Sequence, residues 1–149
     1  MKALLVDNRD SFTWNLEHLL AGLGVDVEVR RYGPGALADP GAAELLVISP
    51  GPGRPEDYPE YRALEGWRGP VLGICLGMQV LSALDGGTTA RLPGCVHGKA
   101  DVVADLWGRA WVVGRYHSLW CETLGEGWDV LGRNPAGVPM AIVHRGLPR

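Results

Sequence analysis

Residues 70–84 read Pro-Val-Leu-Gly-Ile-Cys-Leu-Gly-Met-Gln-Val-Leu-Ser-Ala-Leu, and this stretch decides the fold class. The apolar run over residues 70–74 predicts a buried strand, and the residues from Leu76 to about Leu84 predict a helix. The chain must therefore turn sharply at Cys75. A buried strand that turns directly into a helix is typical of α/β proteins built on a parallel sheet.

The rest of the first half alternates strand and helix patterns in the same way. Charged residues alternate with valines over residues 25–29, which indicates a strand near the edge of the sheet. Alternating strands and helices imply a parallel sheet with right-handed crossovers and helices on both faces. The other expected elements are strands over Ala3–Asp7, Val25–Val29 and Leu45–Ile48, a helix with an apolar face of Phe12, Leu16, Leu19, Leu20 and Leu23, and a short helix around Glu60–Trp67.

The second half differs, because its strand-like pieces are short and are separated by Gly, Pro and Asn. These pieces are expected to form an antiparallel extension of the parallel core. The 149 residues then form one α/β domain, a three-layer open sheet that is mostly parallel. The pieces are Val102-Val103, Trp111–Val113, Trp120–Glu122, Val130-Leu131 and Met140–Val143.

Composition excludes several classes of protein. With 14 Lys and Arg against 17 Asp and Glu, the net charge is −3, so neither a nucleic acid nor a membrane is expected as a partner. The apolar runs are far shorter than the roughly 20 residues of a spanning helix. Three cysteines without a C-x-x-C pair argue against structural zinc and a disulfide framework. No metal and no cofactor are expected, and the lack of an export signal favours a cytoplasmic location.

The turn Gly73-Ile74-Cys75-Leu76-Gly77 has the form of a nucleophile elbow, with Cys in place of Ser. Such a turn strains the central residue, tolerates only small residues two positions away, and lifts the side chain off the sheet. The helix N-terminus is expected to lower the pKa of the Cys75 thiol. The Leu76 N–H would point into the same space and donate to an oxyanion. The alternative is a buried structural cysteine between two packing glycines.

A second loop, Ser49-Pro50-Gly51-Pro52-Gly53-Arg54-Pro55, follows the strand over residues 45–48. Its prolines stiffen the backbone, and its glycines let a ligand approach closely. The loop is expected to flank the elbow, with the Gly53 N–H as a second oxyanion donor. The alternative is an ordinary turn. The four histidines are His18 in the first helix, His97 and His117 in loops, and His144 at the end of a strand-like run, and each alone is more often structural than catalytic.

Five motifs in order now resemble those of class I, or triad-type, glutamine amidotransferases, which have a flavodoxin-like fold. The resemblance covers essentially the whole chain and is closest to the glutaminase component of anthranilate synthase (component II) or of para-aminobenzoate synthase. The motifs are Asp7-Asn8-Arg9-Asp10-Ser11-Phe12-Thr13, Ser49-Pro50-Gly51-Pro52-Gly53, Gly73-Ile74-Cys75-Leu76-Gly77-Met78-Gln79, His97-Gly98-Lys99 and Arg115-Tyr116-His117-Ser118-Leu119.

The resemblance implies a role for each matching residue. Cys75 would attack the side-chain carboxamide of L-glutamine, and the amides of Gly53 and Leu76 would form the oxyanion hole. Glutamine would be held by Gly51, Pro52, Gly53, Gln79, Ser118 and Leu119. Ammonia would pass to a chorismate-binding synthase subunit, component I, in tryptophan biosynthesis or, alternatively, in the para-aminobenzoate branch that leads to folate. The Asp7–Thr13 and His97-Gly98-Lys99 segments are expected at the rim of the docking surface.

The chain departs from the family at the general base. The family uses the histidine of a His-Pro-Glu run on a late strand, and no His-x-Glu occurs in this sequence. We expect that residues 1–149 form a single amidotransferase domain that lacks its C-terminal segment. One alternative is a catalytically degenerate subunit, and another is substitution of the base by His117 or His144. Two further alternatives are another class I amidotransferase and a flavodoxin-type binding module.

Overall fold

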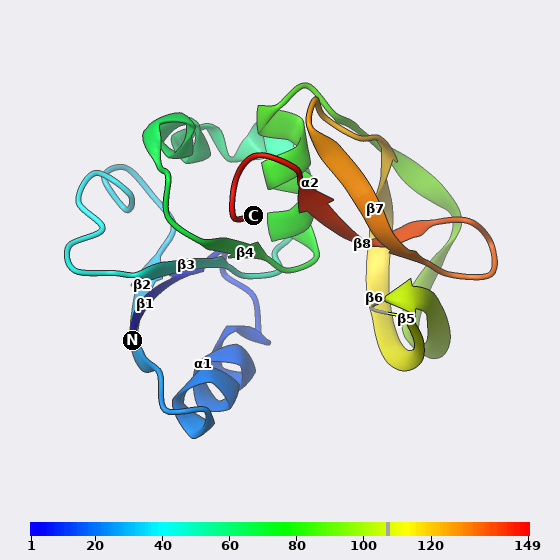
Figure 1. Cartoon of the computed structure of the whole chain (residues 1–149), viewed down its shortest axis with the longest axis horizontal. Helices are drawn as coiled ribbons and strands as arrows, with labels where there is room; N and C mark the ends of the chain where they lie inside the picture. Colours follow the sequence, from blue (N-terminus) through cyan, green and yellow to red (C-terminus); the bar gives the residue numbers. More distant parts are fainter. Residues whose placement is uncertain (107) are drawn as a thin grey trace.

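A four-stranded parallel sheet forms the N-terminal half of the computed structural model, which describes residues 1–106 and 108–149 (Figure 1). Its strands follow the order β2-β1-β3-β4, and all three pairings are parallel. The predicted parallel core is therefore confirmed, with β2 at an edge as its charge alternation indicated. The strands are β1 (Lys2–Asp7), β2 (Asp26–Arg31), β3 (Leu45–Ile48) and β4 (Val71–Gly73).

Helices lie on both faces of this sheet (Figure 1). Helix α1 (Thr13–Gly22) covers one face, and α2 (Leu76–Leu84) covers the other together with two 3-10 helices, η1 (Pro55–Asp57) and η2 (Pro59–Gly66). The short helix expected around residues 60–67 is thus present, but it is a 3-10 helix. Within residues 1–106 and 108–149, no helix is long and apolar enough to cross a membrane.

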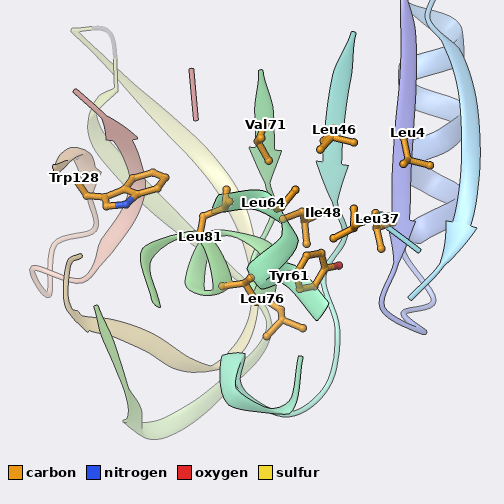
Figure 2. Packing of buried hydrophobic residues seen from close by; sticks show 12 residues of the cluster. Leu4, Leu37, Leu46, Ile48, Tyr61, Leu64, Val71, Leu76, Leu81 and Trp128 are labelled. Atoms are coloured by element: carbon orange, nitrogen blue, oxygen red, sulfur yellow. The ribbon is translucent and has the colours of Figure 1, made fainter. Parts of the chain in front are cut away.

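The main core lies between the parallel sheet and α2 (Figure 2). Side chains of alternate positions on β1 and β3 meet side chains of α2 and η2, and each is almost fully removed from solvent. Burying a side chain of this size contributes about 1.5–3 kcal/mol, so this layer supplies much of the stability. The cluster contains Leu4, Val6, Leu37, Leu46, Ile48, Tyr61, Leu64, Val71, Leu76, Val80, Leu81 and Trp128.

The apolar face expected on α1 is only partly buried. Leu16 and Leu20 are half-buried, whereas 61% of Leu19, 73% of Leu23 and 46% of Phe12 are exposed. Partial burial is therefore limited to two of the five residues of the expected apolar face. The helix contacts β1 and β2 through a narrow face, and the ring of Phe12 at its start packs against Tyr116 of β6 (Arg109–Thr123) with ring centroids 5.7 Å apart.

The second half forms a separate antiparallel sheet with the order β6-β5-β7-β8. The two pieces expected over residues 130–131 and 140–143 lie in separate short strands, as predicted. The other three pieces lie instead in two long strands, because antiparallel pairing continues through register shifts such as those between Arg91 and Val96 and between His97 and Lys99. His97 and His117 therefore lie in strands and not in loops. The strands are β5 (Thr88–Leu106), β6 (Arg109–Thr123), β7 (Trp128–Arg133) and β8 (Pro139–His144).

The two sheets are joined through α2 and through the last residues of the chain. The indole Nε1 of Trp128 donates to Asp85 Oδ2 at 2.7 Å, where the chain leaves α2. After β8 the chain curls back beside β4 and α2, where the Val71 N–H donates to the Pro148 carbonyl at 2.8 Å (Figure 1). These contacts hold the antiparallel sheet against the end of α2 and against the first residue of β4.

Candidate active site

Cys75 occupies a strained turn between β4 and α2. Its backbone has φ 55° and ψ −103°, a conformation that costs a non-glycine residue free energy. A Cβ atom on Gly73 would lie 2.5 Å from the Gly77 carbonyl carbon, and one on Gly77 would lie 2.5 Å from the Ile48 carbonyl oxygen. Only glycine fits at either position, so the predicted elbow geometry is confirmed.

The Pro-Gly loop flanks the elbow, as expected. Strands β3 and β4 pair in parallel, so the loop after Ile48 and the turn after Gly73 emerge at the same edge of the sheet. A Cβ atom on Gly51 would lie 2.7 Å from Cδ2 of Leu76. The backbone of the loop is therefore in direct contact with the first residue of α2.

A buried polar cluster that sequence reasoning missed supports this loop. The Asn8 N–H donates to Ser49 Oγ and the Asn8 side-chain amide donates to the Ser49 carbonyl, both at 2.9 Å. The hydroxyl of Tyr61 donates to Asn8 Oδ1 at 2.6 Å. All three side chains are buried, so the ends of β1 and β3 are fixed to each other. The available signal was a polar residue directly after each of two buried strands.

A cavity of about 580 Å³ opens in front of the elbow. Of the predicted site residues, Cys75, Gln79 and Leu119 line it, and Pro50 brings the start of the Pro-Gly loop to its wall. Gly51, Pro52, Gly53, Leu76 and Ser118 are not among its lining residues. The wall is mostly apolar, and the charged or titratable side chains on it besides Cys75 are Asp10, Arg115, Tyr116 and His117.

Gln79 ties the nucleophile helix to the antiparallel sheet. Its side chain is buried, and Nε2 donates to the Leu119 carbonyl at 3.1 Å. The same carbonyl lies 2.8 Å from Nδ1 of His117. The neighbouring Ser118 hydroxyl lies 3.3 Å from Nε2 of His97. The hydrogen bond from Gln79 thereby joins this segment of β6 to α2.

The pKa of the Cys75 thiol is raised, contrary to expectation. Burial is the main cause, and the negative charge of Asp10 adds to it. A hydrogen bond from the Leu76 N–H favours the thiolate and opposes both effects. Desolvation therefore outweighs the hydrogen bond from the first N–H of α2, and the nucleophile needs a base to remove its proton.

His117 is the one histidine that lines the cavity among the described residues. Arg115 Nε donates to His117 Nε2 at 3.1 Å, so the ring is neutral and its Nδ1–H donates to the Leu119 carbonyl. Burial lowers the pKa of this histidine. With both ring nitrogens engaged, His117 is not free to accept the proton of Cys75.

The other candidate base is engaged elsewhere. Nδ1 of His144 accepts the N–H groups of Gly146 and Leu147, each at 3.0 Å, and its ring packs edge-on against Trp128. Within the described residues, no three His, Cys, Asp or Glu side chains come together as a metal site requires. The arrangement provides a cysteine nucleophile, an N–H beside it that can donate a hydrogen bond, and a cavity that a small substrate could enter.

Known proteins with similar sequences and structures identify the family. The family model Glutamine amidotransferase class-I matches residues 4–149. Anthranilate synthase component 2, pyocyanine specific, of Pseudomonas aeruginosa is 41% identical over 88% of this chain and 73% of that protein. Aminodeoxychorismate synthase component 2 of Klebsiella aerogenes is 38% identical over 95% of this chain and 83% of that protein.

The fold agrees with this relationship. The crystal structure of a glutamine amidotransferase from Thermotoga maritima superimposes with a TM-score of 0.78 at 16% identity, over 99% of this chain and 74% of that one. The match spans both sheets and the elbow between them. The chain belongs to the class I glutamine amidotransferase family.

Proposed function

We propose that this chain is the glutaminase component of a chorismate-aminating synthase. It would hydrolyse L-glutamine and deliver the ammonia to a chorismate-binding component I. The observation that carries the proposal is the position of Cys75, strained at the start of α2, bonded by the Leu76 N–H and facing a cavity with Gln79 and Leu119.

The geometry supports an acyl-transfer reaction. The thiolate would attack the carboxamide carbon, and the carbonyl oxygen would become an oxyanion held by the amides of Leu76 and Gly53. Collapse of this intermediate would expel ammonia and leave a glutamyl thioester on Cys75. Water would then hydrolyse the thioester to glutamate and restore the thiol. Gly51, Pro52, Ser118 and the other predicted binding residues would hold the amino-acid end of glutamine.

The names of the relatives support a synthase partner. One is a component of anthranilate synthase and the other of aminodeoxychorismate synthase, so both name component 2 of a larger enzyme. We propose anthranilate synthesis first, because the relative with 41% identity belongs to it. The para-aminobenzoate branch is the alternative.

The general base is proposed to come from a polypeptide segment outside residues 1–149. Within the described residues β4 pairs only with β3 as a strand, and 46% of Leu72 is exposed on it. The Pro148 carbonyl meets this edge of β4 at Val71, and the remainder of the edge, beside the elbow, is where a further strand with its base would fit. The intact mass of the protein isolated from its source tests this, because a mass of 16.0 kDa would contradict it.

Glutamate release from L-glutamine tests the function itself. The assay should be run alone, with anthranilate synthase component I and with aminodeoxychorismate synthase component I. Cys75→Ser should abolish glutamate release, whereas Cys121→Ser, at a buried cysteine that does not line the cavity, should retain it. Stimulation by only one component I would identify the pathway. Equal release from the Cys75→Ser variant would overturn the proposal.

A catalytically degenerate subunit is the second candidate. The engagement of both ring nitrogens of His117 and the raised pKa of the Cys75 thiol favour it. Such a protein would bind component I without releasing glutamate. Binding in a pull-down with purified component I, combined with no glutamate release by the full natural chain, would support this alternative.

A further inference from the structure

The peptide group between Pro52 and Gly53 carries the N–H that the proposed oxyanion hole requires. In a trans peptide the C=O and N–H groups point in opposite directions, and the described residues contain no cis peptide. Whatever holds the Pro52 carbonyl therefore also sets the direction of the Gly53 N–H.

This peptide group can adopt either of two orientations, that of a type II turn or that of a type I turn. Gly53 has φ +77°, the value typical of the third residue of a type II turn, where proline commonly precedes it. A type I turn places the same residue at negative φ, and the two differ by reversal of the central peptide. Glycine adopts both signs of φ at similar cost, so the loop sequence alone does not select one.

Tyr58 makes the contact that selects one of these two orientations of the peptide. Its hydroxyl donates to the Pro52 carbonyl at 2.8 Å, and it is a half-buried residue that does not line the cavity. The carbonyl is thus directed toward Tyr58, and the Gly53 N–H is directed away from it. Next to Tyr58, Asp57 Oδ2 accepts the Arg54 N–H at 3.0 Å, so one short segment holds the loop on both sides of Gly53.

The ring of Tyr58 is itself held in place. It packs edge-on against Tyr32 with ring centroids 4.8 Å apart, and it lies 6.2 Å from the ring of Tyr61. Tyr61 is completely buried and bonds Asn8 beneath the same loop. The hydroxyl that meets the Pro52 carbonyl therefore extends from a fixed aromatic cluster.

We propose that Tyr58 is a positioning residue, whose hydroxyl holds the Pro52 carbonyl and so turns the Gly53 N–H toward the oxyanion. The proposal rests on the proposed glutaminase function. It assigns to Tyr58 no contact with glutamine. Its loss should therefore weaken stabilisation of the tetrahedral intermediate and leave binding of the substrate unchanged.

Tyr58→Phe tests this, with Tyr32→Phe as the matched control. Both variants lose one hydroxyl from the same cluster, but the Tyr32 hydroxyl accepts the Glu60 N–H and does not touch the loop. Tyr58→Phe should lower kcat for glutamate release about three- to tenfold, the factor that one ordinary hydrogen bond provides. KM should stay the same. Alkylation of Cys75 by iodoacetamide should also be unchanged, because it forms no oxyanion.

Each result decides the proposal. An unchanged kcat in Tyr58→Phe, an equal loss in Tyr32→Phe, or a rise in KM without a fall in kcat would overturn it. If the unmodified chain releases no glutamate even with component I, the proposed function fails separately. In that case the positioning role is tested by NMR, through the chemical shifts of the Pro52 carbonyl carbon and of the Gly53 amide. A shift of both in Tyr58→Phe alone supports the positioning role, and no shift overturns it.

Discussion

At the two glycines of the elbow, Gly73 and Gly77, the packing leaves no room for a Cβ atom. Gly77 is in contact with the backbone of β3, and Gly73 is in contact with the backbone of α2. Neither glycine has a positive φ, so backbone conformation does not require glycine at these positions. Their role is close approach, which brings the strand, the nucleophile and the helix into one compact turn.

Gly77→Ala should destabilise the fold by about 1–3 kcal/mol, because its methyl group would overlap the Ile48 carbonyl. Urea unfolding followed by circular dichroism measures this. Gly22→Ala is the control, since nothing lies within 4 Å of a Cβ there and it lies in helix α1. That variant should be unchanged or up to about 1 kcal/mol more stable. Equal stability of both variants would contradict the packing assigned to the elbow.

Asp10→Asn should make Cys75 more reactive. The carboxylate raises the pKa of the thiol, so its removal should lower that pKa and increase the thiolate fraction at neutral pH. Asparagine can still accept the Phe12 N–H, which keeps the loop in place. The rate of iodoacetamide alkylation against pH should shift toward lower pH. An unchanged profile would show that the Asp10 charge does not reach the thiol.

At the level of elements, β5 and β6 are bound to each other by a partly buried network. Arg115 Nη1 donates to Asp101 at 2.7 Å, Asn134 donates to the same carboxylate at 2.9 Å, and Arg115 also donates to His117. The pKa of Asp101 is lowered, chiefly by the hydrogen bond from Asn134. The network connects β5 and the residue that follows β7 to β6, the strand that carries Leu119.

His117 should make stability depend on pH. Burial holds its pKa below the usual 6.5, so an unfolded chain binds the proton more readily than the folded one. The contribution is complete above about pH 6.5 and is lost as the pH falls through the lower folded value. A proton on Nε2 would also remove the acceptor of Arg115 and place two cations together, near His97 and Asp101.

Urea midpoints measured between about pH 8 and pH 5 check this prediction. His117→Gln should flatten the fall toward acid pH. His18→Gln is the control, because 78% of that side chain is exposed on α1. If both variants keep the same slope as the unmodified chain, the pH dependence has another source.

The elements that sequence patterns predicted are those decided locally. Leu45–Ile48 is a continuous apolar run, and Gly73-Ile74-Cys75-Leu76-Gly77 combines small residues with a change of periodicity. The joined strands of the second half were not predictable in this way. Their pairing depends on contacts between distant residues, and Pro93 and Gly94 resemble a break although a bulge carries the strand past them.

The residues of the candidate site likewise fall into those that motifs predict and those whose roles depend on the fold. Cys75 and the Pro-Gly loop follow from motifs, and Gln79 and Leu119, which the resemblance assigned to glutamine binding, line the cavity. Tyr58 and Tyr61 carry no motif, because their roles depend on where the 3-10 segment places their hydroxyls. The sign of the thiol pKa shift was also not predictable, since it depends on how deeply the turn is buried.

For the whole molecule, the two sheets form one unit through Trp128. This residue belongs to β7, yet its ring packs in the core of the parallel sheet, and its Nε1 bonds Asp85 at the end of α2 (Figure 2). The buried Ser82 hydroxyl adds a second link by accepting the Gly125 N–H at 3.1 Å. The antiparallel sheet therefore cannot separate without exposing the core.

The molecule should unfold in one cooperative step. Tryptophan fluorescence and far-ultraviolet circular dichroism should give coincident urea transitions. Trp128→Ala should cost about 3–5 kcal/mol and separate the two probes, because it removes the packing between the sheets. Trp111→Ala, on the exposed part of β6, is the comparison and should keep the transitions coincident. Two separate transitions in the unmodified chain would contradict the shared core.

The burial of Cys75 also bears on survival in an oxidising cell. Peroxides react with thiolates far faster than with thiols, and the sulfinic and sulfonic products are not restored to thiol in most proteins. Because burial keeps this sulfur protonated at rest, it is a poor target for peroxide. A nucleophile that ionises only when a base and an amide substrate arrive together would be spared damage between turnovers.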